Sequence, residues 1–214
     1  MAATQTITVY NALKEKIISG VLSPAESLPE AELAAQHGVS RNTIKKALLM
    51  LESEGFVTIE QNKGAKVRAY SKRVVIEYLE VREALEGLLI RQTVPVITEK
   101  EIASLEDCLA QMRRNKAEEN LLEYSQNNRR FHQILYDACP NRTMAELIIN
   151  LKNQMRKYNS KTILIPGRSE QGLAEHTEIL NALKEREVHK AEQAMCRHIR
   201  GVRQVFEQYF DLLF

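Results

Sequence analysis

Hydrophobic residues recur at helical spacing along most of this chain, and short alternating runs occur in only one region. The first apolar stripe spans residues 5–19, and Gly20 ends it. Its predicted buried members are Ile7, Tyr10, Leu13, Ile17 and Ile18. We therefore expect the chain to open with an amphipathic helix that packs behind the elements that follow it.

Two further helices are predicted around a tight turn at Gly38, a residue that can adopt a positive φ where the first of them ends. Ser40 is a suitable N-cap for the second helix, which is predicted over residues 41–54 and ends before Gly55. The apolar side of this helix contains Ile44, Ala47, Leu48 and Leu51. Two helices joined by a short glycine turn indicate a helix-turn-helix, which places its second helix in the major groove of DNA.

Two short runs of β-type residues, 56–59 and 65–68, flank the turn Gln61-Asn62-Lys63-Gly64. This pattern indicates a β-hairpin, here a basic wing beside the second helix. The candidate DNA-contacting residues are Ser40, Arg41, Asn42, Thr43, Lys45 and Lys46 in the helix and Asn62, Lys63 and Gly64 in the wing. The alternative is an ordinary helical hairpin with a charged solvent-exposed face, but helix, turn, helix and wing in this order favour DNA binding.

The distribution of charge changes what the net charge alone suggests. The chain has 214 residues and a net charge of only +2, so it is not a general nucleic-acid coat. Six of the eight cations in residues 1–70 lie in 41–46 and 61–68, which contain no acidic residue. Such a local basic patch is typical of a salt-sensitive DNA-binding domain. The three cysteines lack CxxC spacing, and no apolar run suits a signal peptide or membrane helix, so we expect a cytoplasmic protein without membrane contact.

From residue 74 onward the pattern is helical to the end of the chain. Six antiparallel helices are predicted: 74–91, one opened by a Thr98/Glu101 capping box, 118–138, 142–158, 169–185 and 189–212, with an irregular loop at 159–168. The first of them carries Leu79, Ala84, Leu85, Leu88 and Leu89. We therefore expect a mainly α protein: a winged helix-turn-helix domain over 1–70, a linker over 71–73, and an all-helical bundle over 74–214 that can enclose a cavity.

Three of the five histidines lie on the apolar faces of their predicted helices. Their rows are Leu121-Ser125-Asn128-His132-Leu135, Leu173-His176-Leu180-Leu183 and Ala191-Met195-His198-Val202, whereas His37 and His189 have polar surroundings. Each buried imidazole needs a polar partner, and a backbone carbonyl or a Ser would satisfy any one of them. For three together beside a carboxamide, a shared divalent metal (Zn, Ni, Mn or Fe) is the simpler hypothesis, although spacing alone does not establish that the three converge.

The first 70 residues resemble the GntR family of bacterial transcription regulators. The matching residues are Ser27-Leu28-Pro29, Leu33-Ala34, Gly38-Val39-Ser40-Arg41, Ala47-Leu48, Leu51-Glu52, Glu54-Gly55 and Gly64-Ala65. Two features depart from the family pattern: Ala25 replaces the turn glycine after Pro24, and Ile44-Lys45-Lys46 replaces the usual Val-Arg-Glu. Lys45 keeps a charge but lacks the bidentate fork of arginine, which implies a different operator preference.

Residues 74–210 resemble the all-helical FCD effector domain of FadR-type members of this family. The matching pieces are Glu80-Val81-Arg82-Glu83-Ala84-Leu85-Glu86, Asn128-Arg129-Arg130-Phe131-His132, Leu135-Tyr136, Glu175-His176, Ile179-Leu180, Ala182-Leu183, Met195 and His198-Ile199. In metal-binding members, an Asp or Asn and three His hold a divalent metal next to a small carboxylate ligand. The resemblance gives these roles to Asn128, His132, His176 and His198. Because Asn128 is neutral, this site has one negative charge fewer than an Asp would give it.

A carboxylate effector would also need a cationic partner. Arg82 is the first candidate, because it falls within the family's recurring first-helix motif, and its alternative role is a salt bridge. Asn153 and Arg156 are further candidates, on a helix that should border the cavity.

Together these features predict a ligand-responsive repressor that binds a pseudo-palindromic operator in double-stranded DNA as a homodimer. One alternative keeps the regulator but makes the histidines core residues and the effector a larger acyl-type ligand. The other is a metalloenzyme built in a helical bundle. The residues three before the histidines are Arg129, Leu173 and Met195 rather than Glu, so the di-iron motif is absent, and no HExxH motif or Gly-rich phosphate loop occurs.

Overall fold

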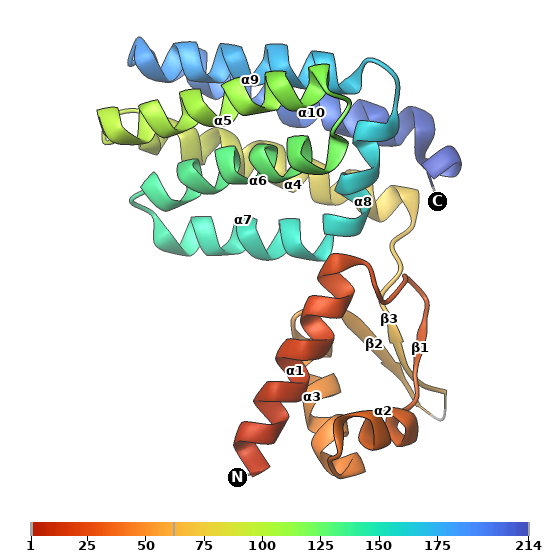
Figure 1. Ribbon diagram of the computed structural model, residues 1–214. Helices are drawn as coiled ribbons and strands as arrows, with labels where there is room; N and C mark the ends of the chain where they lie inside the picture. Colours follow the sequence, from red (N-terminus) through yellow and green to blue (C-terminus); the bar gives the residue numbers. More distant parts are fainter. Residues whose placement is uncertain (1, 62, 214) are drawn as a thin grey trace. The chain divides into compact units, whose positions relative to one another are not determined.

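The computed structural model describes residues 2–61 and 63–213, and the chain separates into two compact units (Figure 1). The first contains Met1–Ser71 and Asn153–Lys157, and the second contains Lys72–Lys152 and Tyr158–Phe214. Of the expected linker 71–73, only Ser71 lies outside a helix, because α4 already begins at Lys72. None of the described helices combines the length and the apolar composition that crossing a membrane requires.

The first unit begins with α1 (Ala2–Ser19), which packs against α3 (Arg41–Ser53). The buried residues of α1 are Thr6, Val9, Tyr10, Leu13 and Ile17. The predicted amphipathic helix is therefore present, but Ile7 was placed wrongly, since its side chain is 46% exposed. Val9 and Thr6 take its place because they lie four and seven residues before Leu13, on the same helical face.

The helix-turn-helix forms as predicted. α2 (Glu30–His37) ends at Gly38, which has a left-handed φ of 63°. Ser40 then caps α3, and its Oγ accepts a hydrogen bond from the Thr43 backbone N–H at 3.1 Å. The four predicted apolar residues of α3, Ile44, Ala47, Leu48 and Leu51, are all buried. The polar side of α3 is thereby left facing solvent.

A three-stranded antiparallel sheet completes the first unit. β2 (Val57–Glu60) and β3 (Gly64–Val67) form the predicted hairpin, in which Glu60 pairs with Gly64. β1 (Ser27–Leu28) adds to the other edge of β3, so that the strand order is β1-β3-β2. β1 was not predicted, because two residues are too few to form a recognisable alternating pattern. The unit is a winged helix-turn-helix.

Helices follow one another from Lys72 onward. They are α4 (Lys72–Thr93), α5 (Glu99–Ala117), α6 (Leu121–Ala138), α7 (Arg142–Gln154), α8 (Arg156–Lys161), the 3₁₀ helix η1 (Thr162–Leu164), α9 (Arg168–Lys184) and α10 (Val188–Leu213). α10 packs along α4 and α9, and α5 packs against α6 and α9. Two predictions were wrong. The helix predicted over 142–158 is interrupted at Met155. Most of the loop predicted over 159–168 is helical, because the turn residues Pro166-Gly167 lie only near the end of that segment.

The buried face of α4 differs from its predicted apolar face. Of the predicted residues, Leu79 and Leu89 are buried, Leu85 is half-buried, and Ala84 and Leu88 are exposed. Arg82 and Glu86 are buried instead, and their ion pair measures 2.7 Å. A search for hydrophobic periodicity cannot detect a core face that contains a charged pair, which explains the error.

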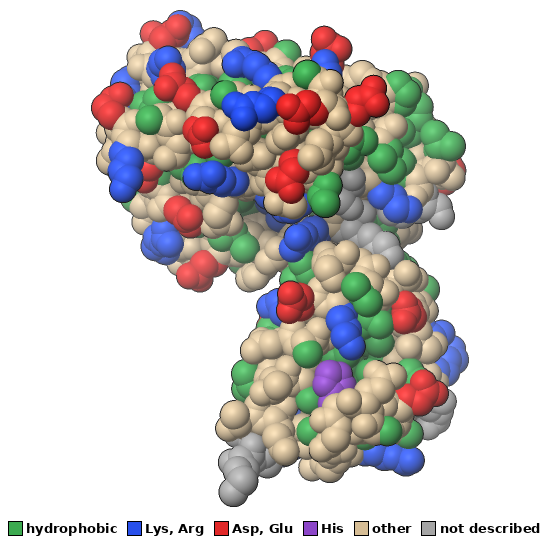
Figure 2. Space-filling model, viewed as in Figure 1, with side chains coloured by type: hydrophobic (Ala, Val, Ile, Leu, Met, Phe, Trp, Pro, Cys, Tyr) green, Lys and Arg blue, Asp and Glu red, His purple; other side chains and the backbone are tan. Residues whose placement is uncertain are grey.

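The surface of the second unit is mixed in charge. On the face that Figure 2 shows, Lys and Arg side chains are interspersed with Asp and Glu side chains. The small net charge of the chain is thus distributed rather than divided into large patches on this face. The unusual chemistry of this unit lies in its interior.

Ala25 provides a test of the turn that precedes β1. Its φ is 65°, and its N–H donates a hydrogen bond to Val67 O at 2.9 Å. Backbone strain at a non-glycine residue in this left-handed region costs about 1–2 kcal/mol, and glycine would relieve it. The greater conformational entropy of glycine in the unfolded state offsets about 0.5–1 kcal/mol of that gain. Ala25→Gly should therefore stabilise the first unit by about 0.5–1 kcal/mol, measured by native-state hydrogen exchange.

The matched control is Ala35→Gly, the same substitution at an exposed position within α2. There glycine relieves no strain, so it should destabilise the unit by about 0.5–1 kcal/mol. If both substitutions destabilise the unit equally, the turn at Ala25 is not strained.

Candidate functional site

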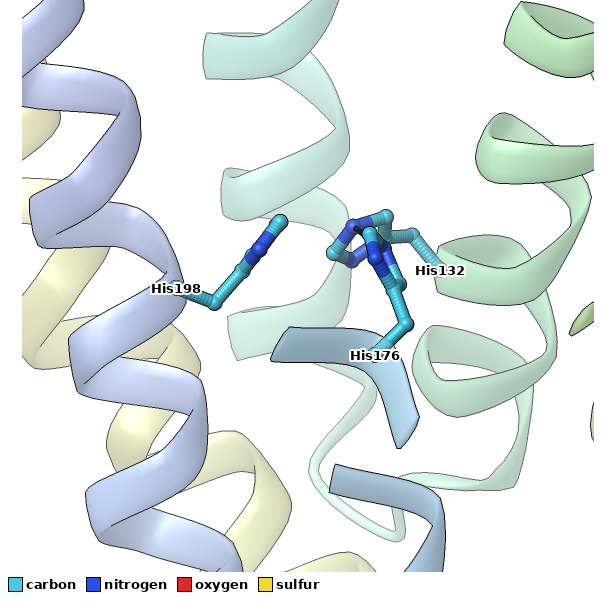
Figure 3. A group of neighbouring side chains, drawn as sticks. All are labelled: His132, His176 and His198. Carbon is cyan, nitrogen blue, oxygen red and sulfur yellow. Dashed lines mark hydrogen bonds between the residues drawn. The ribbon is translucent and has the colours of Figure 1, made fainter. Parts of the chain in front are cut away.

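Three helices bring their imidazoles to one point in the interior of the second unit. His132 comes from α6, His176 from α9 and His198 from α10, and the three rings face one another in Figure 3. All three are buried, and one nitrogen from each ring lies within 4.8 Å of the others. The convergence that the helical rows suggested is therefore present.

Two of the three rings are oriented by hydrogen bonds on their outer side. His176 Nδ1 lies 2.5 Å from Gly172 O, and His198 Nδ1 lies 2.8 Å from Glu175 Oε2. A carbonyl and a carboxylate accept hydrogen bonds, so we assign the proton of each ring to Nδ1. The Nε2 lone pairs of both rings then face the centre of the cluster. This is the arrangement that metal-binding histidines adopt in proteins.

His132 completes the cluster in a different way. Its Nε2 lies 3.2 Å from His176 Nε2, while its Nδ1 has no hydrogen-bond partner among the described residues and is 3.8 Å from Glu86 Oε2. Since His176 Nε2 carries a lone pair, His132 Nε2–H donates to it. Ligation of a metal through His132 Nε2 would require the proton on Nδ1, and Glu86 Oε2 lies 3.8 Å from that nitrogen.

Asn128 lies one turn before His132 on α6, and its Oδ1 is buried without a hydrogen-bond partner among the described residues. Buried oxygens are rarely left unsatisfied, so this atom calls for a ligand or a water. Three imidazole nitrogens and one amide oxygen form a donor set for Zn, Ni, Mn or Fe. His132 Nε2 and His176 Nε2 are 3.2 Å apart, and one nitrogen from each of the three rings lies within 4.8 Å of the others, so the three could share one ion. These residues fit a divalent metal.

The protonation state of the cluster also suits a metal. Burial lowers the pKa of His176 and of His198 to about 3, and it lowers the pKa of His132 well below 6.5. All three rings are therefore neutral near pH 7. A metal would not compete with protons for their lone pairs under these conditions.

A buried charged network lies beside His132. Glu86 accepts hydrogen bonds from Arg82 Nε at 2.8 Å and from the Tyr136 hydroxyl at 2.8 Å, and Lys152 Nζ donates to the Tyr136 oxygen at 2.6 Å. Burial alone would raise the pKa of Glu86, but Arg82 and Lys152 hold it below its ordinary value. Burial lowers the pKa of Lys152 to about 7. Arg82, and Lys152 when it is protonated, thus share one carboxylate, which leaves the site favourable to an anion.

This network includes both the candidate cation and residues that sequence reasoning missed. Arg82 makes the salt bridge that was its alternative role, yet it does so next to the histidine cluster. Glu86, Tyr136 and Lys152 were not identified as site residues. The spacing of four between Arg82 and Glu86 was a signal that could have indicated their pairing.

The remaining effector candidates do not belong to the same unit as the histidines. Asn153 and Arg156 belong to the segment Asn153–Lys157, which groups with the first unit, whereas the histidines belong to the second. Their roles remain predictions.

On α3, most of the predicted DNA-contacting side chains face solvent. Arg41, Asn42, Lys45 and Lys46 are exposed. Thr43 differs, because it is only 7% exposed and its Oγ1 lies 2.9 Å from Ser40 Oγ. Both Ser40 and Thr43 therefore serve the cap of α3, and little of the Thr43 side chain is accessible to DNA.

In the wing, Lys63 is exposed and forms an ion pair with Glu60 at 3.0 Å, and Gly64 has a φ of 81°. Asn62, the remaining candidate of the wing, lies outside the described residues. The Lys63 side chain is 72% exposed, so its ammonium group has further donors available for a phosphate.

Comparisons with known proteins agree with both units. Residues 5–67 match the family described as bacterial regulatory proteins, gntR family, and residues 77–201 match the FCD domain. The chain is 28% identical over 192 residues to the uncharacterized HTH-type transcriptional regulator YdhC of Bacillus subtilis. The match covers 88% of this chain and 85% of YdhC. It is 26% identical over 207 residues to the HTH-type transcriptional repressor RspR of Escherichia coli. This match covers 95% of this chain and 91% of RspR.

Among solved structures, E. coli McbR/YncC shares the fold. The TM-score is 0.78 at 22% sequence identity, over 96% of this chain and 98% of that chain.

Gly201 allows a test of the outer hydrogen bond to His198. A Cβ at Gly201 would lie 2.6 Å from Glu175 Oε1, so Gly201→Ala would push away the carboxylate that orients His198. Loss of such an outer partner typically lowers metal affinity 10–100-fold, and we expect a loss of about that size for Zn²⁺. Competition with a chromogenic chelator measures it.

Gly87→Ala is the matched control, because a Cβ at Gly87 would lie 2.7 Å from Cys196 Sγ. This variant creates a comparable clash in α4, but the clash does not involve Glu175. Its Zn²⁺ affinity should equal that of the wild type. An equal loss in both variants would mean that packing, not the orientation of His198, determines metal affinity.

Proposed function

The chain belongs to the GntR family of bacterial transcription regulators, in the group that carries an FCD domain, and we propose that it is a repressor controlled by a small carboxylate bound beside a divalent metal. The chain is a transcription regulator and not an enzyme. The observation that carries the proposal is the convergence of three neutral imidazoles, together with the unsatisfied oxygen of Asn128 one helical turn before His132. RspR, a relative over most of the chain, is named a repressor, which supports the sign of regulation.

DNA recognition is assigned to the first unit. The N-terminal end of α3 presents two amide or guanidinium side chains, Asn42 and Arg41, together with Lys45 and Lys46. These groups suit base edges and phosphates in the major groove. A homodimer would present two such helices to a pseudo-palindromic operator, one in each half-site.

Effector binding is assigned to the second unit. The metal would be held by Asn128, His132, His176 and His198, and it would supply a positive charge and an open coordination position for a carboxylate oxygen. Arg82 and Lys152 add cationic character on the side of His132. Such surroundings favour an anion over a neutral or purely apolar ligand.

Regulation requires that the effector bind two states of the dimer with different affinities. In the proposed scheme, one state spaces the two recognition helices to match the operator, and the carboxylate stabilises the other state. Binding of the carboxylate then releases the operator. Coupling of this kind is typically worth about 1–3 kcal/mol, or about 5–150-fold in operator affinity.

Arg41→Ala tests the assignment of the DNA-contacting surface. If Arg41 reads a base, the variant should bind an operator selected by the wild type from random duplexes more weakly by about 1–3 kcal/mol, measured by fluorescence anisotropy. If Arg41 contacts only a phosphate, the loss of affinity should be the same for all DNA sequences. The slope of log K against log salt concentration should then be smaller by about one.

The control is Lys16→Ala, which removes a cation in the last turn of α1. Its operator affinity should remain close to that of the wild type. If Arg41→Ala binds as tightly as this control, Arg41 is not part of the DNA-contacting surface.

A further inference from the structure

Two rows of side chains meet beside the histidine cluster. On α6, Tyr124, Asn128 and His132 follow one another at intervals of four residues, and on α9, Arg168, Gly172 and His176 do the same. The rows are joined at one end by His132 and His176, 3.2 Å apart. At the other end, the Tyr124 hydroxyl donates to Ser169 O at 3.0 Å.

Arg168 is buried in this region with its hydrogen bonds incomplete. It is only 7% exposed, and its Nη2 donates to Glu175 Oε2 at 2.9 Å. Its Nη1 is also buried and has no hydrogen-bond partner among the described residues. Glu175 must in addition accept the hydrogen bond from His198, so one carboxylate serves both a guanidinium and an imidazole. A buried N–H of a charged group without a partner is costly, which indicates that another acceptor belongs there.

Gly172 lies against the free arm of Arg168. A Cβ at Gly172 would lie 3.1 Å from the Tyr124 hydroxyl and 3.5 Å from Arg168 Nη1, so a side chain at this position would crowd both polar groups. Glycine within a helix costs about 0.5–1 kcal/mol relative to alanine, so its presence in α9 calls for a local reason. The same residue offers its carbonyl to His176 Nδ1. The free arm of Arg168 is therefore about one helical turn from the histidine cluster, or about 6 Å along α9.

We propose that Arg168 forms a second anion-binding position in the effector site, and that the effector is a dicarboxylate. This inference rests on the proposed function. One carboxylate binds beside the metal, and the other accepts a hydrogen bond from Arg168 Nη1. The separation of about one helical turn suits a chain of four or five carbons. Arg82 and Lys152 lie on the side of His132 and do not take this second role, because their hydrogen bonds go to Glu86 and Tyr136.

The experiment compares ligands that differ by one carboxylate. Isothermal titration of the full-length, Zn²⁺-loaded protein with glutarate and with valerate, which have the same number of carbons, measures the value of the second carboxylate. We expect the wild type to bind glutarate about 10–100-fold more tightly than valerate, the range for a buried hydrogen bond to a charged group. In Arg168→Gln, saturated with Zn²⁺, this preference should disappear, because the affinity for glutarate falls toward that for valerate.

Gly172→Ala is the second variant, because it keeps Arg168 but places a methyl group against its Nη1. It too should lose the preference for glutarate and retain Zn²⁺. Equal affinities of wild type for the two acids, or binding of neither, would overturn the proposal and leave a water as the partner of Arg168. A preference for glutarate that persists in Zn²⁺-saturated Arg168→Gln would also overturn it, since Arg168 would then act only by positioning Glu175. A wild type that binds no Zn²⁺ would instead refute the proposed function, and this inference with it.

Discussion

The interior of the helical unit depends on one constraint, which is that every buried imidazole nitrogen requires a partner. Gly172 O and Glu175 satisfy the outer nitrogens of His176 and His198, and this fixes two lone pairs toward the centre. Lone pairs that face one another in an apolar core repel unless a proton or a cation lies between them. The cluster can therefore be stable with a shared proton on His132, but its geometry suits a cation better.

The surroundings of the cluster follow from that constraint. Glu86 stands behind His132 and Glu175 stands behind His198, and each carboxylate is held by a buried arginine, Arg82 or Arg168. Glycines admit these groups where a side chain would collide: Gly201 faces Glu175, and Gly172 faces Arg168. Charged pairs of this kind are weak evidence for stability, so their burial on two helices, α4 and α9, indicates function. The same arrangement makes the site receptive to anions.

Sequence reasoning predicted the helices and the inward faces of the histidine-bearing ones better than it predicted short strands and the partners of long side chains. The rows that contain His132, His176 and His198 predicted that the three imidazoles face inward, because helical spacing identifies the inward face. Their convergence was a hypothesis that spacing alone did not establish. The same reasoning missed β1, which has only two residues, and misplaced the core face of α4, where Arg82 and Glu86 replace hydrophobic residues. It also missed Glu175 and Arg168, although Arg168 lies in the row of His176. Spacing places a Cα on a face, but it does not tell where the end of a long side chain finds its partner.

The most direct test of the account is the metal content of the purified, tag-free protein. Elemental analysis after reconstitution with Zn²⁺ or Ni²⁺ should find about one metal per chain in the wild type and none in His176→Ala, with the helical content unchanged by circular dichroism. Absence of metal from the reconstituted wild type would contradict the account. The histidines would then be core residues, and the search for an effector would turn to larger, metal-independent ligands.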